Sequence, residues 1–185
     1  LPLDVYINAE KMYNSAQATA AGQFNSIRLS QDKSFFSLEA KGATESYFTV
    51  YPGGTVTTGQ YIVFKYRLPS SNAEKITSFD TFASTKNSTA QGEDAFYYGK
   101  ALLNDGQWHV IVVDLASWEK PSYTAASDGT YKANYVRFDP FYQNPVGVFF
   151  EYAFFGMNDN VEDIYALVSD MEAIQYVSRI DGNVT

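Results

Sequence analysis

Apolar and polar residues alternate along many short stretches of this chain, which is the pattern of β-strands with one buried and one solvated face. Residues 134–157 contain two such stretches joined by a short loop. In the first, Val136 and Phe138 share one face, and Arg137 and Asp139 share the other. We therefore predict a half-buried strand here, with its aromatic face toward a core.

The second stretch of this pair, residues 148–155, is apolar on nearly both faces, which predicts a central strand. Residues 60–68 alternate just as clearly. From these patterns we predict that one core is lined by Ile62, Phe64, Tyr66, Val136, Phe138, Phe150, Tyr152 and Phe154.

Other stretches extend the series to about ten short strands separated by turn signals such as Asn104-Asp105-Gly106. They are residues 3–9, 24–29, 34–40, 47–51, 75–84, 95–103, 108–115 and 173–177. Residues 15–22 fit a loop or a short helix. Asn158 to Asn160 can cap a helix over 161–168. The pattern predicts an all-β fold: a jelly-roll β-sandwich of two antiparallel sheets with one short helix near the C-terminus.

Length and composition narrow the classes of partner. The chain has 185 residues, no Cys and a net charge of −8, so we expect one domain, no disulfide and little affinity for nucleic acid or anionic membranes. No apolar run reaches the roughly 18 residues of a membrane-spanning helix, so no membrane insertion is expected. Because the sequence starts at Leu1-Pro2 without a signal segment, we interpret residues 1–185 as a single domain excised from a larger multidomain protein.

Four segments in serial order resemble a known family. YIVFKYR, DGQWHVIVVDL, YVRFDPF and VFFEYAFFG, within residues 60–156, look like successive strands of galactose-binding-like jelly-roll carbohydrate-binding modules of bacterial secreted or cell-surface proteins. The resemblance implies a non-catalytic module, not an enzyme, that binds a glycan on a sheet face or at loop tips. It also implies an extracellular or cell-surface location, with the other domains of the same parent chain as neighbours.

The same resemblance bears on metals. Such modules often carry a structural Ca²⁺ ion and require no other cofactor. The resemblance also implies one calcium ligand at Asp170 or Glu172, just before the last predicted strand. Residues 158–163 also offer oxygen ligands, but they lack the spacing and the central Gly of an EF-hand loop. We therefore interpret them as a helix N-terminus.

Sugar binding requires flat apolar rings flanked by polar groups. Trp118 lies in a polar segment with no obvious role in the core, so it is the first candidate; it can also fold back over an edge of the sandwich. Tyr97 and Tyr98 place one ring on each face of a strand. Tyr142 is either a contact residue or part of a plug under the strands. Trp108 begins an apolar strand, and we expect it in the core.

A second candidate surface is polar. Arg137 and Glu151, with Asp139, are predicted to share a sheet face, with Lys65 and Arg67 nearby. They fit a platform that binds hydroxyl groups, or a solvated salt-bridge face, which we favour. Asp139 and Glu151 could also be the two carboxylates of a glycosidase, one of which needs a raised pKa. A neighbouring Arg137 should lower a carboxylate pKa rather than raise it, which argues against this interpretation.

Other catalytic chemistry has little support. His109 is the only His, so a metal site built on several His is excluded, and the residue lies within an apolar strand where a structural role is expected. The leading function is carbohydrate binding. The alternatives are a structural or adhesive cell-surface domain that binds a protein partner and, less favoured, a glycoside-active enzyme.

Overall fold

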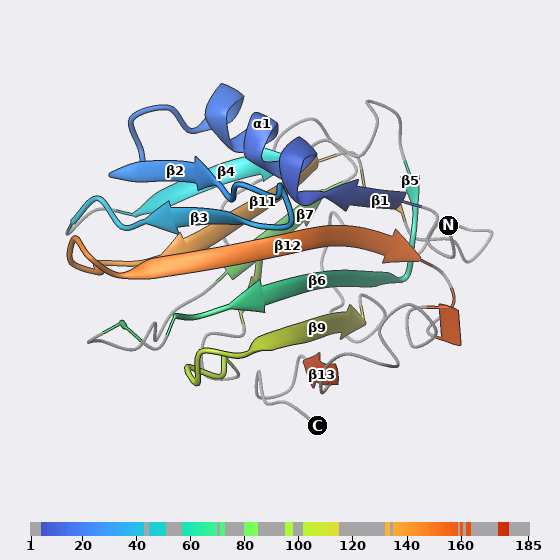
Figure 1. Ribbon diagram of the computed structural model, residues 1–185. Helices are drawn as coiled ribbons and strands as arrows, with labels where there is room; N and C mark the ends of the chain where they lie inside the picture. The colour runs from blue at the N-terminus through green and yellow to red at the C-terminus, as the bar shows by residue number, and fades with distance from the viewer. Residues whose placement is uncertain are drawn as a thin grey trace.

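The computed structural model describes residues 5–42, 45–50, 57–69, 71–72, 80–84, 95–97, 102–114, 132–133, 135–158, 160, 162–163 and 174–177. Most of these residues lie in strands, and nearly all of the strand pairs are antiparallel (Figure 1). The all-β prediction is confirmed for this part of the chain. No helix among the described residues is long and apolar enough to cross a membrane.

The described strands form three sheets. The seven-stranded sheet contains β13 (Ile174–Val177), β9 (Trp108–Asp114), β6 (Tyr61–Arg67), β12 (Phe149–Asn158), β3 (Phe36–Glu39) and β2 (Ser26–Leu29) in that order, with β1 (Val5–Asn8) also paired to β12. The four-stranded sheet has the order β4 (Ser46–Val50), β11 (Tyr135–Phe141), β7 (Asp80–Ser84) and β8 (Ala95–Tyr97). A two-stranded sheet pairs β10 (Lys132–Ala133) with β5 (Thr57–Thr58).

The two predicted strands of residues 134–157 belong to different sheets. β11 lies in the four-stranded sheet and β12 in the seven-stranded sheet, so the loop between them connects the two layers. In this loop Gln143 and Gly147 have positive φ, at 56° and 97°. One pairing departs from the prediction of purely antiparallel sheets, because β13 runs parallel to β9.

The two larger sheets meet through an aromatic core. Phe138 of β11 has its ring centroid 5.7 Å from that of Phe64 and 5.5 Å from those of Tyr152 and Phe155, all of which belong to the seven-stranded sheet. Phe48 of β4 stacks on Phe138 at 5.3 Å. Side chains from both layers therefore share one buried interior, where aromatic pairs add to the area that each ring buries.

Seven of the eight residues predicted for this core are found there; the prediction was wrong for Phe154. The pairing of β12 with β6 shifts register between Tyr152 and Phe154. Such an irregularity inserts one residue and reverses the alternation of faces beyond it. Phe155 consequently points into the main core, and Phe154 joins a second buried cluster with Val63.

The structure describes a helix that was not predicted with these bounds, α1 (Ala9–Thr19), near the N-terminus; of the helix predicted near the C-terminus, it describes residues 162 and 163, which are helical. Residues 15–22, which fitted a loop or a short helix, contain only the second half of α1. Asn8 caps α1, because the side-chain oxygen accepts a hydrogen bond from Lys11 N at 2.9 Å. Met12 and Ala16 are buried in the main core. Most of the predicted helix 161–168 lies outside the described residues.

Candidate functional site

The residues predicted for a sugar site fall into three groups. Trp118 and Tyr98, the potential calcium ligands Asp170 and Glu172, and the ring of Tyr97 lie outside the described part. Tyr142 is 54% exposed in the β11–β12 loop. Arg137 and Glu151 are buried polar residues on different sheets. The structure therefore does not bring the described candidates together.

Arg137 belongs to a cluster on the outer side of β11, the side opposite the core residue Phe138. Its Nε and one terminal nitrogen each donate to Asp139 at 2.7 Å, and the same terminal nitrogen lies 3.3 Å from Glu45. The guanidinium carbon lies 3.7 Å from the ring centroid of Tyr47. Arg137 is thus fixed by a carboxylate and by an aromatic face, as in a structural ion pair.

Arg137 lowers the pKa of Asp139 as predicted, but the net shift of that pKa is upward. Burial raises the pKa of Asp139 to about 7 despite the lowering by Arg137, and a hydrogen bond with Glu45 acts in the same direction as burial. Desolvation of the carboxylate therefore outweighs the attraction of the neighbouring cation. Only 3% of the residue is exposed, so this carboxyl group does not face a ligand from solvent.

Glu151 lies on the opposite side of the molecule from Asp139. Its neighbours Phe150 and Tyr152 point into the core, so Glu151 points to the outer side of the seven-stranded sheet. There it accepts a hydrogen bond from Arg67 Nε. The prediction that Arg137, Asp139 and Glu151 share one sheet face is therefore wrong, and Asp139 and Glu151 do not form a glycosidase pair because the core separates them.

The strand register creates a row of side chains across this outer face. Trp108 pairs with Arg67, Arg67 with Glu151, Glu151 with Ser37, and Ser37 with Arg28. We call this set the transverse row. It crosses five strands, from β9 to β2, and with neighbouring strands about 4.8 Å apart it is roughly 19 Å long. Within the row, Glu151 is buried, Arg28 is exposed to solvent, and the other members are partly exposed.

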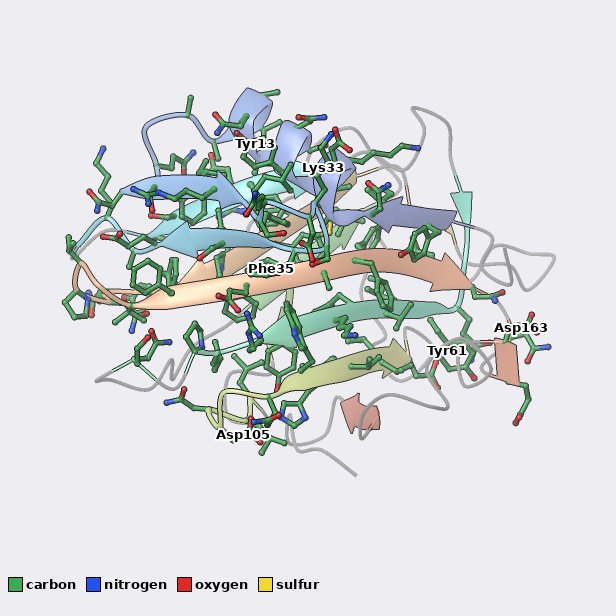
Figure 2. The ribbon with its side chains drawn as sticks, viewed as in Figure 1. Tyr13, Lys33, Phe35, Tyr61, Asp105 and Asp163 are labelled. Atoms are coloured by element: carbon green, nitrogen blue, oxygen red, sulfur yellow. The ribbon has the colours of Figure 1, made fainter. Side chains whose placement is uncertain are left out.

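Two aromatic rings hold Arg67 in the row. The guanidinium carbon of Arg67 lies 4.5 Å from the ring centroid of Trp108 and 4.9 Å from that of Phe35, and the two rings meet edge to face at 5.5 Å. Lys65 Nζ lies 5.6 Å from the Trp108 ring. Figure 2 shows Phe35 near the middle of the viewer-facing side of the sheet. Phe35, Trp108 and Arg67 are partly exposed and Lys65 is buried, so this surface mixes apolar rings with a cationic group.

The grouping of Trp108, Phe35 and Arg67 was not predicted from the sequence. Trp108 was expected in the core, but it is half-buried and absent from both buried clusters. Its neighbour His109 is the residue that points inward, because it pairs with the core residue Tyr66. Alternation in residues 60–68 predicted Arg67 on the outer face. Nothing in the sequence around Phe35 indicates its contact with Trp108, because that contact depends on the order of the strands in the sheet.

The contacts of His109 are those of a structural residue. Its Nε2 lies 2.8 and 2.9 Å from the carboxylate oxygens of Asp105, and its ring centroid lies 5.8 Å from that of Tyr66. Burial opposes the ionisation of Asp105, but hydrogen bonds from His109 and Gln107 outweigh it and lower the pKa of Asp105. Figure 2 shows Asp105 in the turn before β9. The pair fastens this turn to the strand.

The helix N-terminus expected at residues 158–163 is partly described. Asn158 and Asn160 accept backbone hydrogen bonds from Asn160 and Glu162 at 3.3 and 2.9 Å, which is the capping role that the sequence suggested. The described part of the chain contains no cluster of three or more His, Asp or Glu suited to a metal ion.

No family model matches the sequence, and no curated protein matches it. The fold is similar to an exo-1,3/1,4-β-glucanase from a Pseudoalteromonas species, with 13% identity and a TM-score of 0.45 over 80% of this chain and 16% of that chain. It is also similar to the extra C-terminal domain of that enzyme, with 10% identity and a TM-score of 0.41 over 84% of this chain and 87% of the domain.

A third similar structure is described as carbohydrate-binding modules from the β-sandwich superfamily, with 10% identity and a TM-score of 0.38 over 78% of this chain and 59% of that one. The chain thus spans about a sixth of the first structure's length. The second and third names denote an extra domain and binding modules. At these TM-scores none of the three assigns a ligand.

Proposed function

We propose that this chain is a non-catalytic glycan-binding module, and that the transverse row is its binding surface. The observation that carries the proposal is the arrangement of Trp108, Phe35 and Arg67 beside Glu151 on the outer face of a sheet. Partly exposed rings there do not serve the main core. They offer apolar area to the C–H face of a sugar, while the charged groups offer hydrogen bonds to hydroxyls.

The shape of the row suits an extended ligand. A length of roughly 19 Å across five strands accommodates a short oligosaccharide that lies perpendicular to the strands. A site with few rings should bind weakly, with a Kd from the micromolar to the millimolar range. The proposal includes the extracellular or cell-surface location, attachment to other domains of a parent protein and the jelly-roll assignment, all of which follow from the family resemblance.

The test is a soluble-glycan array probed with the purified chain, followed by calorimetry on any hit. We expect binding by the wild type, at least tenfold weaker binding by Trp108→Ala, and no release of reducing sugar. Tyr142→Ala, which removes an exposed ring outside the row, is the matched control and should bind as the wild type does. Absence of any glycan ligand would refute the proposed function.

A second candidate function is adhesion to a protein partner. The observation that favours it is a pair of exposed apolar residues in one loop, Tyr142 at 54% and Val146 at 57%. The loop is anchored, because the Asn72 side chain exchanges two hydrogen bonds of 2.9 Å with the backbone of Phe149. A partner whose binding is lost in the Tyr142→Ala/Val146→Ser double variant, and retained in Trp108→Ala, would support this function instead.

A further inference from the structure

Among the described residues, Arg67 uses only a small part of its hydrogen-bonding capacity. A guanidinium group has five N–H donors in a planar fork. Arg67 uses Nε for Glu151, and among the described residues nothing accepts a hydrogen bond from its two terminal nitrogens. The side chain is 27% exposed. Its four remaining donors are therefore available to a ligand that reaches the exposed part of the side chain.

This fork is fixed before any ligand arrives. Glu151 orients the Nε end, and the rings of Phe35 and Trp108 both lie against the guanidinium group, with centroids 4.9 and 4.5 Å from its carbon. A side chain held in this way loses little conformational entropy when it forms a further bond. A planar fork also matches the two oxygens of a carboxylate better than it matches scattered hydroxyls.

The charges around the row also favour an anionic ligand, although the whole chain carries a net charge of −8. Arg28 is exposed at the β2 end of the row, and Lys65 lies beside Trp108 at the other end. The carboxylates described on this part of the face are already engaged. Glu151 is occupied by Arg67, and Glu39 accepts hydrogen bonds from Asn25 and Ser26. The face therefore presents the exposed Arg28 and the terminal nitrogens of Arg67 beside carboxylates that are already engaged.

From this arrangement we infer that the ligand is an acidic oligosaccharide with uronic acid residues, one carboxylate of which binds the Arg67 fork while the chain extends toward Arg28. This inference rests on the proposed function and names its ligand class. The flanking rings favour a sugar over an acidic peptide, because a pyranose has an apolar face to place beside each carboxylate.

The experiment compares matched ligands by calorimetry. Oligomers of galacturonate, glucuronate, mannuronate and guluronate are each titrated as the free acid and as the methyl ester, beside neutral cello- and xylo-oligosaccharides and poly-glutamate. We expect at least one free acid to bind about tenfold or more tightly than its own ester, since the ester lacks the charge that the fork recognises. Raising the salt concentration should weaken binding of the acid more than that of the ester.

Variants test the residues. Arg67→Lys keeps the charge and loses the fork, so it should remove most of the difference between acid and ester; Arg28→Gln, on an edge strand, should reduce it as well. Lys11→Gln, which removes an exposed cation on α1, is the matched control and should change nothing. Unchanged melting temperatures show that the variants fold.

The outcomes separate the two proposals. Equal binding of acid and ester, or binding of neutral oligosaccharides alone, refutes the acidic ligand and leaves the glycan-binding function standing. Binding of poly-glutamate as tight as that of any uronate refutes the choice of a sugar. If no saccharide of any kind binds, the proposed function fails, and the inference fails with it.

Discussion

Arg67 and Glu151 lie opposite each other on β6 and β12, and Arg67 Nε donates a hydrogen bond to the Glu151 carboxylate although 84 residues separate them in the sequence. Their side chains are 27% and 12% exposed, so the pair is screened by water only in part. Both rings that flank Arg67 depend on the same alignment of strands. The contact therefore reports directly on the register of the seven-stranded sheet.

A double-mutant cycle should measure this contact. We expect a coupling free energy of about 1 kcal/mol between Arg67→Met and Glu151→Gln, obtained from urea unfolding of the four proteins. The control is the pair Lys33 and Glu10, which lie 3.3 Å apart but are 60% and 44% exposed, and whose coupling should be near zero. Equal coupling in both cycles would show that the half-buried geometry adds nothing.

The aromatic core gives a stability prediction. Phe138 is fully buried and contacts rings from both sheets, so Phe138→Ala should lower the free energy of unfolding by about 3–5 kcal/mol through lost apolar burial and a residual cavity. Tyr142→Ala, a change at an exposed ring, should stay within about 0.5 kcal/mol of the wild type. A loss below about 1 kcal/mol for Phe138→Ala would contradict the core described above.

The sequence allowed much of this core to be predicted, because alternation is a local property. Val136 and Phe138 were assigned to the right face from their spacing alone. Phe154 was not, since the irregularity after Tyr152 leaves no mark in the pattern of residues. The transverse row could not be predicted from the sequence for another reason. Knowing that Arg67 faces Glu151 and Trp108 requires strand order and register, which are set by the whole fold.

The pKa of Asp139 predicts a pH dependence of stability. An ordinary Asp in the unfolded chain has a pKa of 3.8, and burial raises the pKa of Asp139 to about 7 in the folded protein. Between these values the folded state binds more protons than the unfolded state, so the contribution of Asp139 to stability falls as the pH rises from about 4 to about 7. The loss should be on the order of 4 kcal/mol.

The measurement is urea unfolding from pH 4 to pH 8 for the wild type and Asp139→Asn. We expect the difference in free energy of unfolding between the two proteins to change across this window, with the variant gaining relative stability toward pH 7. Asp32→Asn is the control. Hydrogen bonds from Ser34 and Ser30 lower the pKa of this exposed carboxylate, so its removal should leave the slope above about pH 5 as it is. A parallel pair of curves for Asp139→Asn would show that its carboxyl group ionises normally.

His109 is expected to have no part in binding. Its ring lies on the core side of β9 against Tyr66, whereas the transverse row occupies the other side. His109→Gln should therefore leave the affinity for any glycan unchanged, and should lower the melting temperature modestly through the lost contact with Asp105. Calorimetry and thermal unfolding of the same sample test both statements. A hydrolytic activity that disappeared with this change would overturn the non-catalytic assignment.

The chain contains two Trp residues, Trp108 and Trp118, and this allows the two candidate sites to be separated by fluorescence. Trp118→Phe leaves Trp108, on the transverse row, as the only Trp. We expect a saturable change in its emission on titration with the glycan, because a sugar beside the ring displaces water from it. Trp108→Phe leaves Trp118, the first candidate from the sequence, and should show no saturable change together with weaker binding. The opposite result, a signal from Trp118 alone with affinity retained in Trp108→Phe, would place the site in the segment around Trp118 and refute the transverse row as the binding surface.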